Sequence, residues 1–361
     1  METFYYSSSI ILIIFSIIPL IQNQYWIFRV FDFLKVQILF LQIFLFIIGY
    51  IFVPFTIYFY ITQICLIFCI VWELILLYKY TPFYKVKSFK TENKSSKKHT
   101  ILSANVYQFN TEYTKFISLI NKFQPDVFIT MESNKKWDNA LRNLEVEYKF
   151  SEKIPLENTY GIHLYSKLPF KYVKTHYFIA DDIPSIEATI KTDEGYEFTV
   201  FAVHPPPPSP TEEKTSKERD GELLAIAKHI RNNNYKACIV IGDFNNVAWG
   251  KSSILFRKTS QMIDPRIGRG LISTYHAKYR LLRFPIDQMF HSKEIFVEVI
   301  KALEYFGSDH LPLFCEFTID YKNDEQLLEV EDLEKGDMKE VNKIIEEGIK
   351  EDGERDAVVK E

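Results

Sequence analysis

The hydrophobic positions of the chain are concentrated in its first 78 residues. Residues 9–21 are nearly all Ile, Leu and Phe, and residues 36–78 stay apolar for about twice the roughly 20 residues that one helical span needs. Almost no polar residues occur at helical spacing, so a buried soluble core does not explain the pattern. The pattern predicts three transmembrane helices near residues 4–22, 35–53 and 56–78, with a break near Gly49–Pro54.

Charges around these spans predict an orientation. No basic residue precedes Arg29, so the first span does not resemble a signal peptide. The basic residues near the spans gather in two connections that three spans would place on one side: Arg29, Lys35, Lys79, Lys85, Lys87, Lys90, Lys94, Lys97 and Lys98. The positive-inside rule predicts an integral plasma-membrane protein with this side, and the domain that follows, in the cytoplasm. Glu73 is the one acid inside a span, and we expect it to extend toward the interface near Lys79.

Composition divides the chain into four parts. Residues 1–80 form the anchor, and residues 81–99 are a basic linker too polar to fold alone. Residues 100–321 are expected to form one globular domain. Residues 322–361 are Glu-rich and predict a solvated helix or a disordered tail without a chemical role.

Within residues 100–321, short apolar runs alternate with amphipathic stretches. Strands are predicted at residues 101–106, 126–131, 160–165, 198–203, 238–241, 284–290 and 313–317, and helices at 111–123, with a cap at Asn110 or Thr111, and at 211–232. This alternation predicts an α/β fold: a two-sheet α/β sandwich flanked by helices and preceded by the three transmembrane helices.

Polar side chains follow several of these strands. The run 238–241 ends in Gly242-Asp243-Phe244-Asn245, which alone is also typical of an ordinary strand-to-loop turn. Other predicted strands contain a carboxylate, amide or imidazole, end in one, or begin just after one. The full set is Asn105, Glu132, His204, Asp243, Asn245, Asp287, Asp309 and His310. We expect these side chains to converge at one end of the sheets.

The chemistry of this set indicates a metal-assisted reaction on phosphate. It is rich in oxygen and holds two imidazoles but no thiolate, which favours Mg²⁺ (or Mn²⁺) over zinc. Asp287 is the expected partner that fixes the tautomer of His310. Hydrolysis of a phosphate ester requires a cation, a base for water and donors for the developing charge, and the set supplies each.

The ordered series of strand Asn105, strand-end Glu132, His204, Gly-Asp-Phe-Asn, Ile-Asp and Ser-Asp-His-Leu-Pro resembles the endonuclease/exonuclease/phosphatase superfamily from about residue 101 to 317. That superfamily includes magnesium nucleases, sphingomyelinases and inositol-phosphate phosphatases. Residues 249–292, with Asp264-Pro265-Arg266-Ile267-Gly268-Arg269-Gly270, Ser273-Thr274-Tyr275 and Pro285-Ile286-Asp287, are similar to a membrane-anchored branch with three N-terminal spans, which includes teicoplanin-resistance membrane proteins.

The resemblance implies a role for each residue. Metal binding falls to Glu132 and Asn105, with Asp309 assisting. The phosphate falls to His204 and Asn245, the water to Asp243, and transition-state stabilisation to the Asp287–His310 pair together with Asp309. The chain departs from the pattern at Tyr107, where some nucleases place another acid, and at Gln288, where the branch usually has His. Resistance-type members are thought to act at the outer face of the membrane, which opposes the charge count.

Residues 251–283 are strongly basic, which suits a phosphate-rich substrate, although we expect at least half of these side chains to be simply solvated. Elsewhere the domain has nearly balanced charge, unlike a processive DNA-binding enzyme. The sequence therefore predicts a membrane-anchored, Mg²⁺-dependent hydrolase of a phosphoester or pyrophosphate, with membrane lipids as partners and a lipid-linked substrate. A membrane-tethered nuclease and a catalytically silent scaffold are the alternatives.

Overall fold

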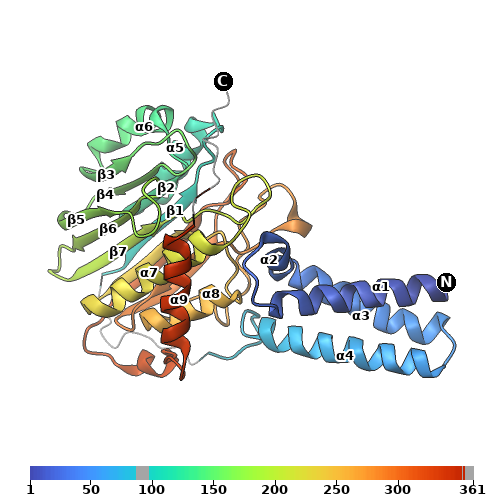
Figure 1. Cartoon of the computed structure of the whole chain (residues 1–361). Coiled ribbons are helices and arrows are strands. Elements are labelled where there is room, and N and C mark those ends of the chain that lie inside the picture. Colours follow the sequence, from blue (N-terminus) through green and yellow to red (C-terminus); the bar gives the residue numbers. More distant parts are fainter. Residues whose placement is uncertain (87–96, 352, 354–361) are drawn as a thin grey trace.

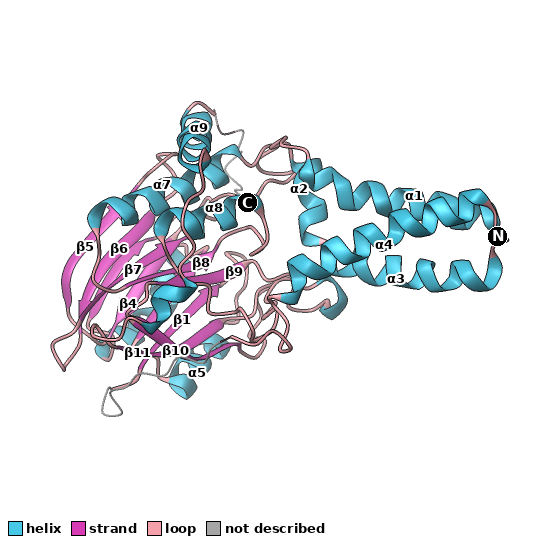
Figure 2. Cartoon of the chain, turned by 90° about the horizontal axis from the view of Figure 1, so that it is seen from below, coloured by secondary structure: helices cyan, strands magenta, loops and turns pink. Residues whose placement is uncertain are grey.

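The chain consists of a bundle of apolar helices attached to a two-sheet α/β domain, as Figures 1 and 2 show. The computed structural model describes residues 1–86, 97–351 and 353, so most of the predicted linker, residues 87–96, lies outside the described residues. The bundle comprises α1 (Glu2–Ile17, continued by a 3₁₀ turn at Ile18–Leu20), α2 (Trp26–Phe33), α3 (Lys35–Phe52) and α4 (Ile57–Tyr78). Glu2–Leu20, Lys35–Phe52 and Ile57–Tyr78 are long and apolar enough to cross a membrane, as predicted. The sequence pattern did not predict α2.

A buried polar cluster joins the three spans. Ser16 Oγ in α1 donates a hydrogen bond to Glu73 Oε1 in α4 at 2.6 Å, and Gln42 Nε2 in α3 donates to Ser16 Oγ at 2.8 Å. Glu73 is fully buried, so the prediction that it extends toward Lys79 is wrong. Lipid offers no hydrogen bonds to such groups, so the cluster favours the one arrangement of helices in which its members meet.

Two mixed β-sheets form the predicted sandwich. The first has the strand order β10-β11-β1-β2-β4-β3 and the second β5-β6-β7-β8-β9. The strands are β1 (His99–Asn105), β2 (Val127–Met131), β3 (Phe150–Ile154), β4 (Ile162–Ser166), β5 (Phe170–His176), β6 (Ser185–Lys191), β7 (Glu197–Val203), β8 (Cys238–Asp243), β9 (Asp287–His291), β10 (Ile295–Ala302) and β11 (Leu313–Ile319). Every predicted strand is present with shifted ends, whereas β3, β5, β6 and β10 were not predicted.

Helices cover the outer faces of both sheets (Figure 1). They are α5 (Tyr113–Phe123), α6 (Lys135–Leu141, followed by a 3₁₀ turn at Arg142–Val146), α7 (Lys217–Asn233), α8 (Lys251–Ser260) and α9 (Asp337–Ile349), with further 3₁₀ turns at Arg280–Leu282 and Glu325–Glu329. The N-cap of α5 is Glu112 rather than Asn110 or Thr111, because Asn110 Oδ1 accepts from Glu112 N at 3.0 Å and forms a turn before the helix. The predicted helix at 211–232 starts later, at Lys217.

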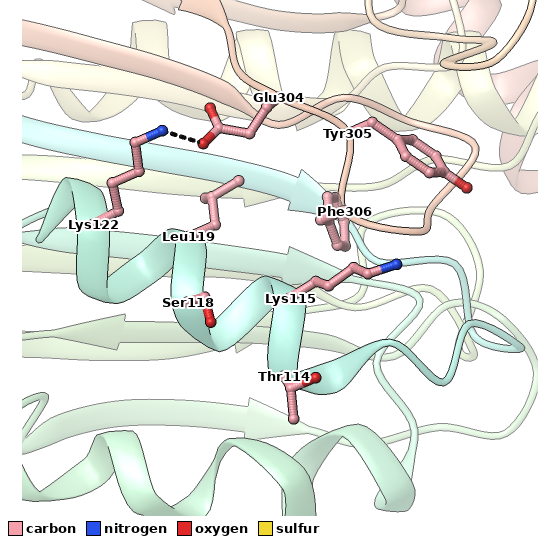
Figure 3. Close-up of a pocket in the computed structure, with 8 residues that line it drawn as sticks. All are labelled: Thr114, Lys115, Ser118, Leu119, Lys122, Glu304, Tyr305 and Phe306. Carbon is pink, nitrogen blue, oxygen red and sulfur yellow. Dashed lines mark hydrogen bonds and ion pairs between the residues drawn. The ribbon is translucent and has the colours of Figure 1, made fainter.

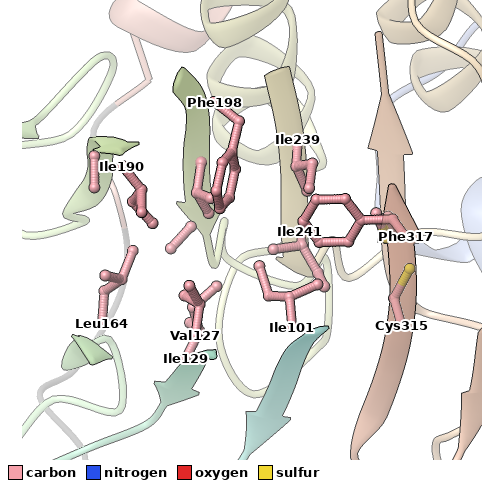
Figure 4. Packing of buried hydrophobic residues seen from close by; sticks show 14 of the residues in the cluster. Ile101, Val127, Ile129, Leu164, Ile190, Phe198, Ile239, Ile241, Cys315 and Phe317 are labelled. Atoms are coloured by element: carbon pink, nitrogen blue, oxygen red, sulfur yellow. The ribbon is translucent and has the colours of Figure 1, made fainter. Parts of the chain in front are cut away.

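The core lies between the inner faces of the sheets, as Figure 4 shows. Ile239 and Ile241 of β8 point inward against Ile101 and Ile129, whereas the alternate residue Val240 packs outward beneath α7. Because side chains alternate between faces along a strand, β8 is apolar on both sides and buried throughout. Its tip, which carries Asp243, is therefore held rigidly.

The C-terminal segment packs on the two-sheet domain instead of being solvated. Val341 of α9 is fully buried in the cluster that also contains residues of α7 and α8. Acids of this segment also pair with α8: Glu340 with Lys251, Glu331 with Arg257 at 2.7 Å and Glu334 with Lys258 at 2.6 Å. The prediction of a solvated or disordered tail is therefore wrong for residues 325–349.

Candidate active site

The register of β1 and β2 brings two predicted ligands together in the first sheet. These strands are parallel, and Asn105 lies opposite Met131, the residue before Glu132. Parallel strands end at the same edge, so the amide and the carboxylate leave the sheet side by side. Glu132 has φ of 59°, an unfavourable left-handed conformation for a residue with a side chain. Such a backbone turns the carboxylate toward the edge at an energetic cost.

The second sheet delivers three more residues to the same region. Val203 of β7 lies opposite Gly242 of β8, and Asp243 lies opposite Asp287 of β9. His204 follows Val203 directly, so it leaves the sheet beside Asp243. A Cβ atom at Gly242 would lie 1.9 Å from the carbonyl oxygen of Val203, so only glycine lets β7 and β8 approach closely here.

Asn105 joins the two sheets at this edge. Its Nδ2 donates to Glu132 Oε1 at 2.8 Å and to Asp243 Oδ2 at 3.2 Å, while its Oδ1 accepts from Tyr107 N at 3.0 Å. The second oxygen of Glu132 accepts from Gln108 N at 3.1 Å. One amide group thus holds the carboxylates of both sheets within reach of a single small ligand.

Glu132 is an unusually perturbed acid. Burial raises its pKa, a hydrogen bond from Asn105 lowers it, and the negative charge of Asp309 raises it further, with a result of about 7. Asp309 therefore lies close enough to Glu132 for the two carboxylates to repel. A nearby cation would relieve both the burial and the repulsion, which is the environment expected of a metal ligand.

Asp287, His310 and Asp243 form a row of charged groups, with one hydrogen bond and one longer ion pair. His310 Nδ1 lies 2.8 Å from Asp287 Oδ2, and His310 Nε2 lies 3.6 Å from Asp243 Oδ2. Burial opposes a charged imidazole, but the carboxylates of Asp287 and Asp243 overcome it and raise the pKa of His310 to about 10. The ring is thus an imidazolium at neutral pH, which can stabilise negative charge.

The segment that carries Asp309 and His310 is held by its neighbours. Ser308 Oγ donates to Asn105 O at 2.8 Å and accepts from His310 N at 3.1 Å. The ring of Tyr275 lies 4.7 Å from that of His310, centroid to centroid. These contacts fix the imidazole on both sides.

His204 and Asn245 border Asp243. His204 Nε2 lies 3.9 Å from Asp243 Oδ2, and His204 Nδ1 is buried without a hydrogen-bond partner in the described part of the chain. Burial lowers the pKa of His204 to about 4, so it is neutral at pH 7. Asn245 N donates to Asp243 Oδ1 at 2.9 Å, and Asn245 Nδ2 donates to Pro205 O at 2.9 Å. Both side chains keep a hydrogen-bonding group available for a ligand.

All eight predicted site residues therefore meet at one edge, and their donor atoms fit a hard divalent cation. Asp243, Asp287 and His310 offer ligand atoms that lie within 4.8 Å of one another. Asp287 and His310 already bond to each other, so the carboxylates of Glu132 and Asp309 are the better candidates to hold a metal. Asn105 presents Nδ2 to the carboxylates and thereby orients them. The site buries carboxylates from both sheets, and burying a negative charge is costly unless a cation lies beside it. A bound divalent cation would supply that charge.

Sequence reasoning assigned no role to Gln108 or Ser308. Gln108 acts through its backbone N–H, for which no side-chain signal exists. Ser308 lies in the quoted Ser-Asp-His motif, and its position before two site residues was the available signal. Gln288, a departure from the expected His, accepts from Arg266 Nη2 at 2.9 Å and donates to Asn246 O, so it supports the loop after Asn245.

The basic segment 251–283 is mostly internal. Arg266 is buried and pairs with Asp264 through bonds of 2.9 and 2.8 Å, and Arg269 Nη2 donates to Val297 O at 2.6 Å. The three basic residues of α8 pair with the C-terminal segment. Most of this segment therefore has structural partners and does not form a phosphate-binding face.

An open hollow of about 270 Å³ lies between α5 and the chain before Phe306 (Figure 3). Its wall carries an ion pair between Lys122 and Glu304 at 2.5 Å. None of the eight site residues lines it, so it is separate from the catalytic edge.

The two-sheet fold and its edge of carboxylates, amides and imidazoles define the class of metal-dependent hydrolases that act on phosphoester bonds. The chain belongs to the Endonuclease/Exonuclease/phosphatase family, whose sequence profile matches residues 102–310. No curated protein sequence matches the chain. As a member of this family it is a metal-dependent phosphoester hydrolase, as predicted.

Solved structures share the fold. TDP2 of D. rerio, in complex with a single-stranded DNA product, has a TM-score of 0.52 at 16% identity and covers 61% of this chain and 99% of its own. The catalytic domain of human nocturnin with bound sulfate has a TM-score of 0.51 at 17% identity, covering 62% and 94%. A family protein from Bacteroides thetaiotaomicron has a TM-score of 0.50 at 17% identity, covering 62% and 99%. At these identities the likeness concerns the fold alone, and it does not test the resemblance to the membrane-anchored branch.

Proposed function

We propose that the chain is a membrane-anchored, Mg²⁺-dependent phosphohydrolase that cleaves a phosphoester or pyrophosphate carried by a membrane lipid.

The observation that carries the proposal is the contact between the anchor and the catalytic edge. In the loop after β8, Trp249 Nε1 donates to Asp32 O at 2.8 Å. Just before β9, the ring of Phe284 meets that of Phe33 edge to face at 5.9 Å. Both contacts are made with α2, and Trp249 also packs in one buried cluster with Leu39 of α3 and Leu77 of α4, the second and third candidate spans. Two of the loops that shape the site thus rest on the anchor. A substrate in the bilayer would reach this site directly, whereas a freely diffusing substrate would need no such placement.

The proposed chemistry assigns a role to each side chain of the site. Glu132 and Asp309 would hold Mg²⁺ with help from Asn105, which orients the Glu132 carboxylate, and the ion would neutralise phosphoryl oxygens when bound. His204 and Asn245 would donate hydrogen bonds to the phosphate.

Asp243 would orient the attacking water and accept its proton. Burial raises the pKa of Asp243, which makes it a stronger base than an exposed aspartate. His310, kept protonated by Asp287, would donate from Nε2 to the oxygen on which negative charge develops.

The test is hydrolysis by the full chain in lipid nanodiscs. A lipid pyrophosphate, a phosphoinositide and DNA would each be offered with Mg²⁺ and with a chelator, and Asp243→Asn would serve as the matched inactive variant. The proposal expects chelator-sensitive release of phosphate from a lipid substrate. Faster cleavage of DNA would favour the tethered nuclease, and indifference to chelator would favour the silent scaffold.

The proposal places the catalytic domain in the cytoplasm on the charge count. Lys35 pairs with Asp32 at 3.2 Å, so part of the positive charge in the first connection is neutralised locally. Reporter fusions after Lys98 decide the side. Alkaline phosphatase activity there would place the domain outside and contradict the charge argument.

A further inference from the structure

The loop at residues 278–283, beside the active site, exposes three large apolar side chains. Tyr279 is 61% exposed, Leu281 86% and Leu282 51%. They lie in and next to the 3₁₀ turn Arg280–Leu282, on a catalytic domain that buries most of its large apolar residues. A compact apolar patch of this kind marks a surface that contacts another phase or molecule.

Contacts with the anchor fix the depth of this loop. Gln37 Nε2 donates to Leu281 O at 2.8 Å, and Gln37 lies in the first turn of α3, a candidate span. The loop is the orange segment beside the anchor in Figure 1. With α3 crossing the bilayer from this turn, the exposed face of Leu281 would lie at the level of the lipid headgroups.

Charges flank the apolar side chains in the pattern of an interfacial segment. Lys278 and Arg280 lie on either side of Tyr279. Arg283 donates to His276 O at 3.3 Å and to Ala277 O, which closes the neck of the loop. Apolar side chains with adjacent cations bind the boundary between acyl chains and anionic headgroups.

The neck of the loop also contacts the catalytic edge. Ala277 N donates to Asp309 O at 2.6 Å, and Tyr275 lies against His310. The exposed apolar loop is thus only a few residues from two groups of the site.

We propose that residues 278–283 form an interfacial loop that inserts Tyr279, Leu281 and Leu282 into the headgroup region of the leaflet that α3 enters. Lys278 and Arg280 bind the phosphates of anionic lipids there. The loop gives the catalytic domain a second attachment to the bilayer and places the Asp309–His310 segment next to the headgroups. The inference rests on the membrane-anchored part of the proposed function, but it does not depend on the substrate.

The experiment measures the depth of the loop in the intact protein. A fluorophore is attached to Leu281→Cys in a Cys65→Ser background, because Cys69, Cys238 and Cys315 are buried. Val146→Cys, at a residue that is 81% exposed in the turn after α6, is the matched control. Each protein is reconstituted in nanodiscs of phosphatidylcholine and phosphatidylglycerol, with or without nitroxide-labelled headgroups.

The proposal expects nitroxide lipids to lower the fluorescence at position 281 by about twofold or more, with little effect at position 146. Equal quenching at the two positions, or quenching at 281 by aqueous iodide alone, would overturn it.

A second arm replaces Lys278 and Arg280 by Ala. Lipid quenching at 281 should fall in discs that contain phosphatidylglycerol and stay unchanged in pure phosphatidylcholine. An equal effect in both lipids would refute the role of the cations. Fluorescence quenching requires no turnover. Failure of the loop proposal would therefore leave the hydrolase proposal intact, and failure of the hydrolase proposal would leave the loop proposal intact.

Discussion

Replacing Asp287 by Asn tests how the imidazole of His310 is kept charged. The amide has the shape of the carboxylate but removes the negative charge that lies 2.8 Å from His310 Nδ1. Asp243 remains at 3.6 Å, so part of the stabilisation of the imidazolium stays. A single opposite charge at such a distance typically moves a pKa by about 1–3 units.

The sign of the effect follows from the direction of the shift. In the native protein the pKa of His310 is raised to about 10, so the ring is protonated at all pH values below that. Without Asp287 the pKa falls, because burial then favours the neutral ring. The alkaline limb of the pH–kcat profile should move down by about 1–3 pH units, whereas kcat at pH 7, where the ring stays at least about half protonated, should fall by less than about tenfold.

The assay is kcat and KM against pH at saturating Mg²⁺ on one substrate. Asp193→Asn is the control, since Asp193 is an exposed partner of Lys97 in the turn before β7, at the opposite end of that strand from His204. The double variant with His310→Ala should be no slower than His310→Ala alone, because the two residues act as a unit. An unchanged alkaline limb with near-native kcat would show that the pair does not act in this way.

Four other substitutions give independent checks. Asp243→Asn should abolish turnover but leave Mg²⁺ binding, measured by calorimetry, largely intact, whereas Glu132→Gln should weaken binding and regain part of its rate in excess Mg²⁺. Burial raises the pKa of Glu222 in the folded protein to about 8, whereas in the unfolded chain this carboxyl ionises near its ordinary pKa of about 4.5. The folded state therefore loses stability as the pH rises from about 4.5 to about 8. Glu222→Gln should remove this loss, seen as a melting temperature that depends less on pH in that window; an identical pH dependence would count against it. Val341→Ala should cost about 2 kcal/mol of stability, and the exposed control Lys343→Ala almost none; equal melting temperatures would mean that α9 contributes little.

The site was the easiest part to predict because its signal is local. A buried, β-branched run that ends in Gly242-Asp243 or Glu132 places a charged residue where burial is costly. This conflict can be read directly from the sequence. The convergence of these ends follows from strand register, for which the sequence gives only the order of elements. The bond from Gln108 N to Glu132 was invisible because a backbone group has no residue-type signature.

Elements on the outside of the fold were harder to predict. β5 is an edge strand in which Lys171 and Tyr172 are exposed, so its apolar alternation is weak. In the C-terminal segment, Met338, Val341 and Ile345 lie on one helical face, but the many acids around them gave the composition of a solvated tail. Those acids neutralise α8 only once the chain has folded back on itself, a long-range pairing that no local pattern encodes.

The bond from Trp249 to Asp32 and the contact of Phe284 with Phe33 have a geometric consequence. They couple the loops around the site to α2 of the anchor, so the distance from the catalytic edge to the candidate spans is set by the fold and cannot vary with the reach of a tether. A lipid hydrolase of the kind proposed above would therefore discriminate among its substrates by the height of the scissile phosphate above the acyl-chain boundary. Two headgroups with the same chemistry but different lengths would then be unequal substrates.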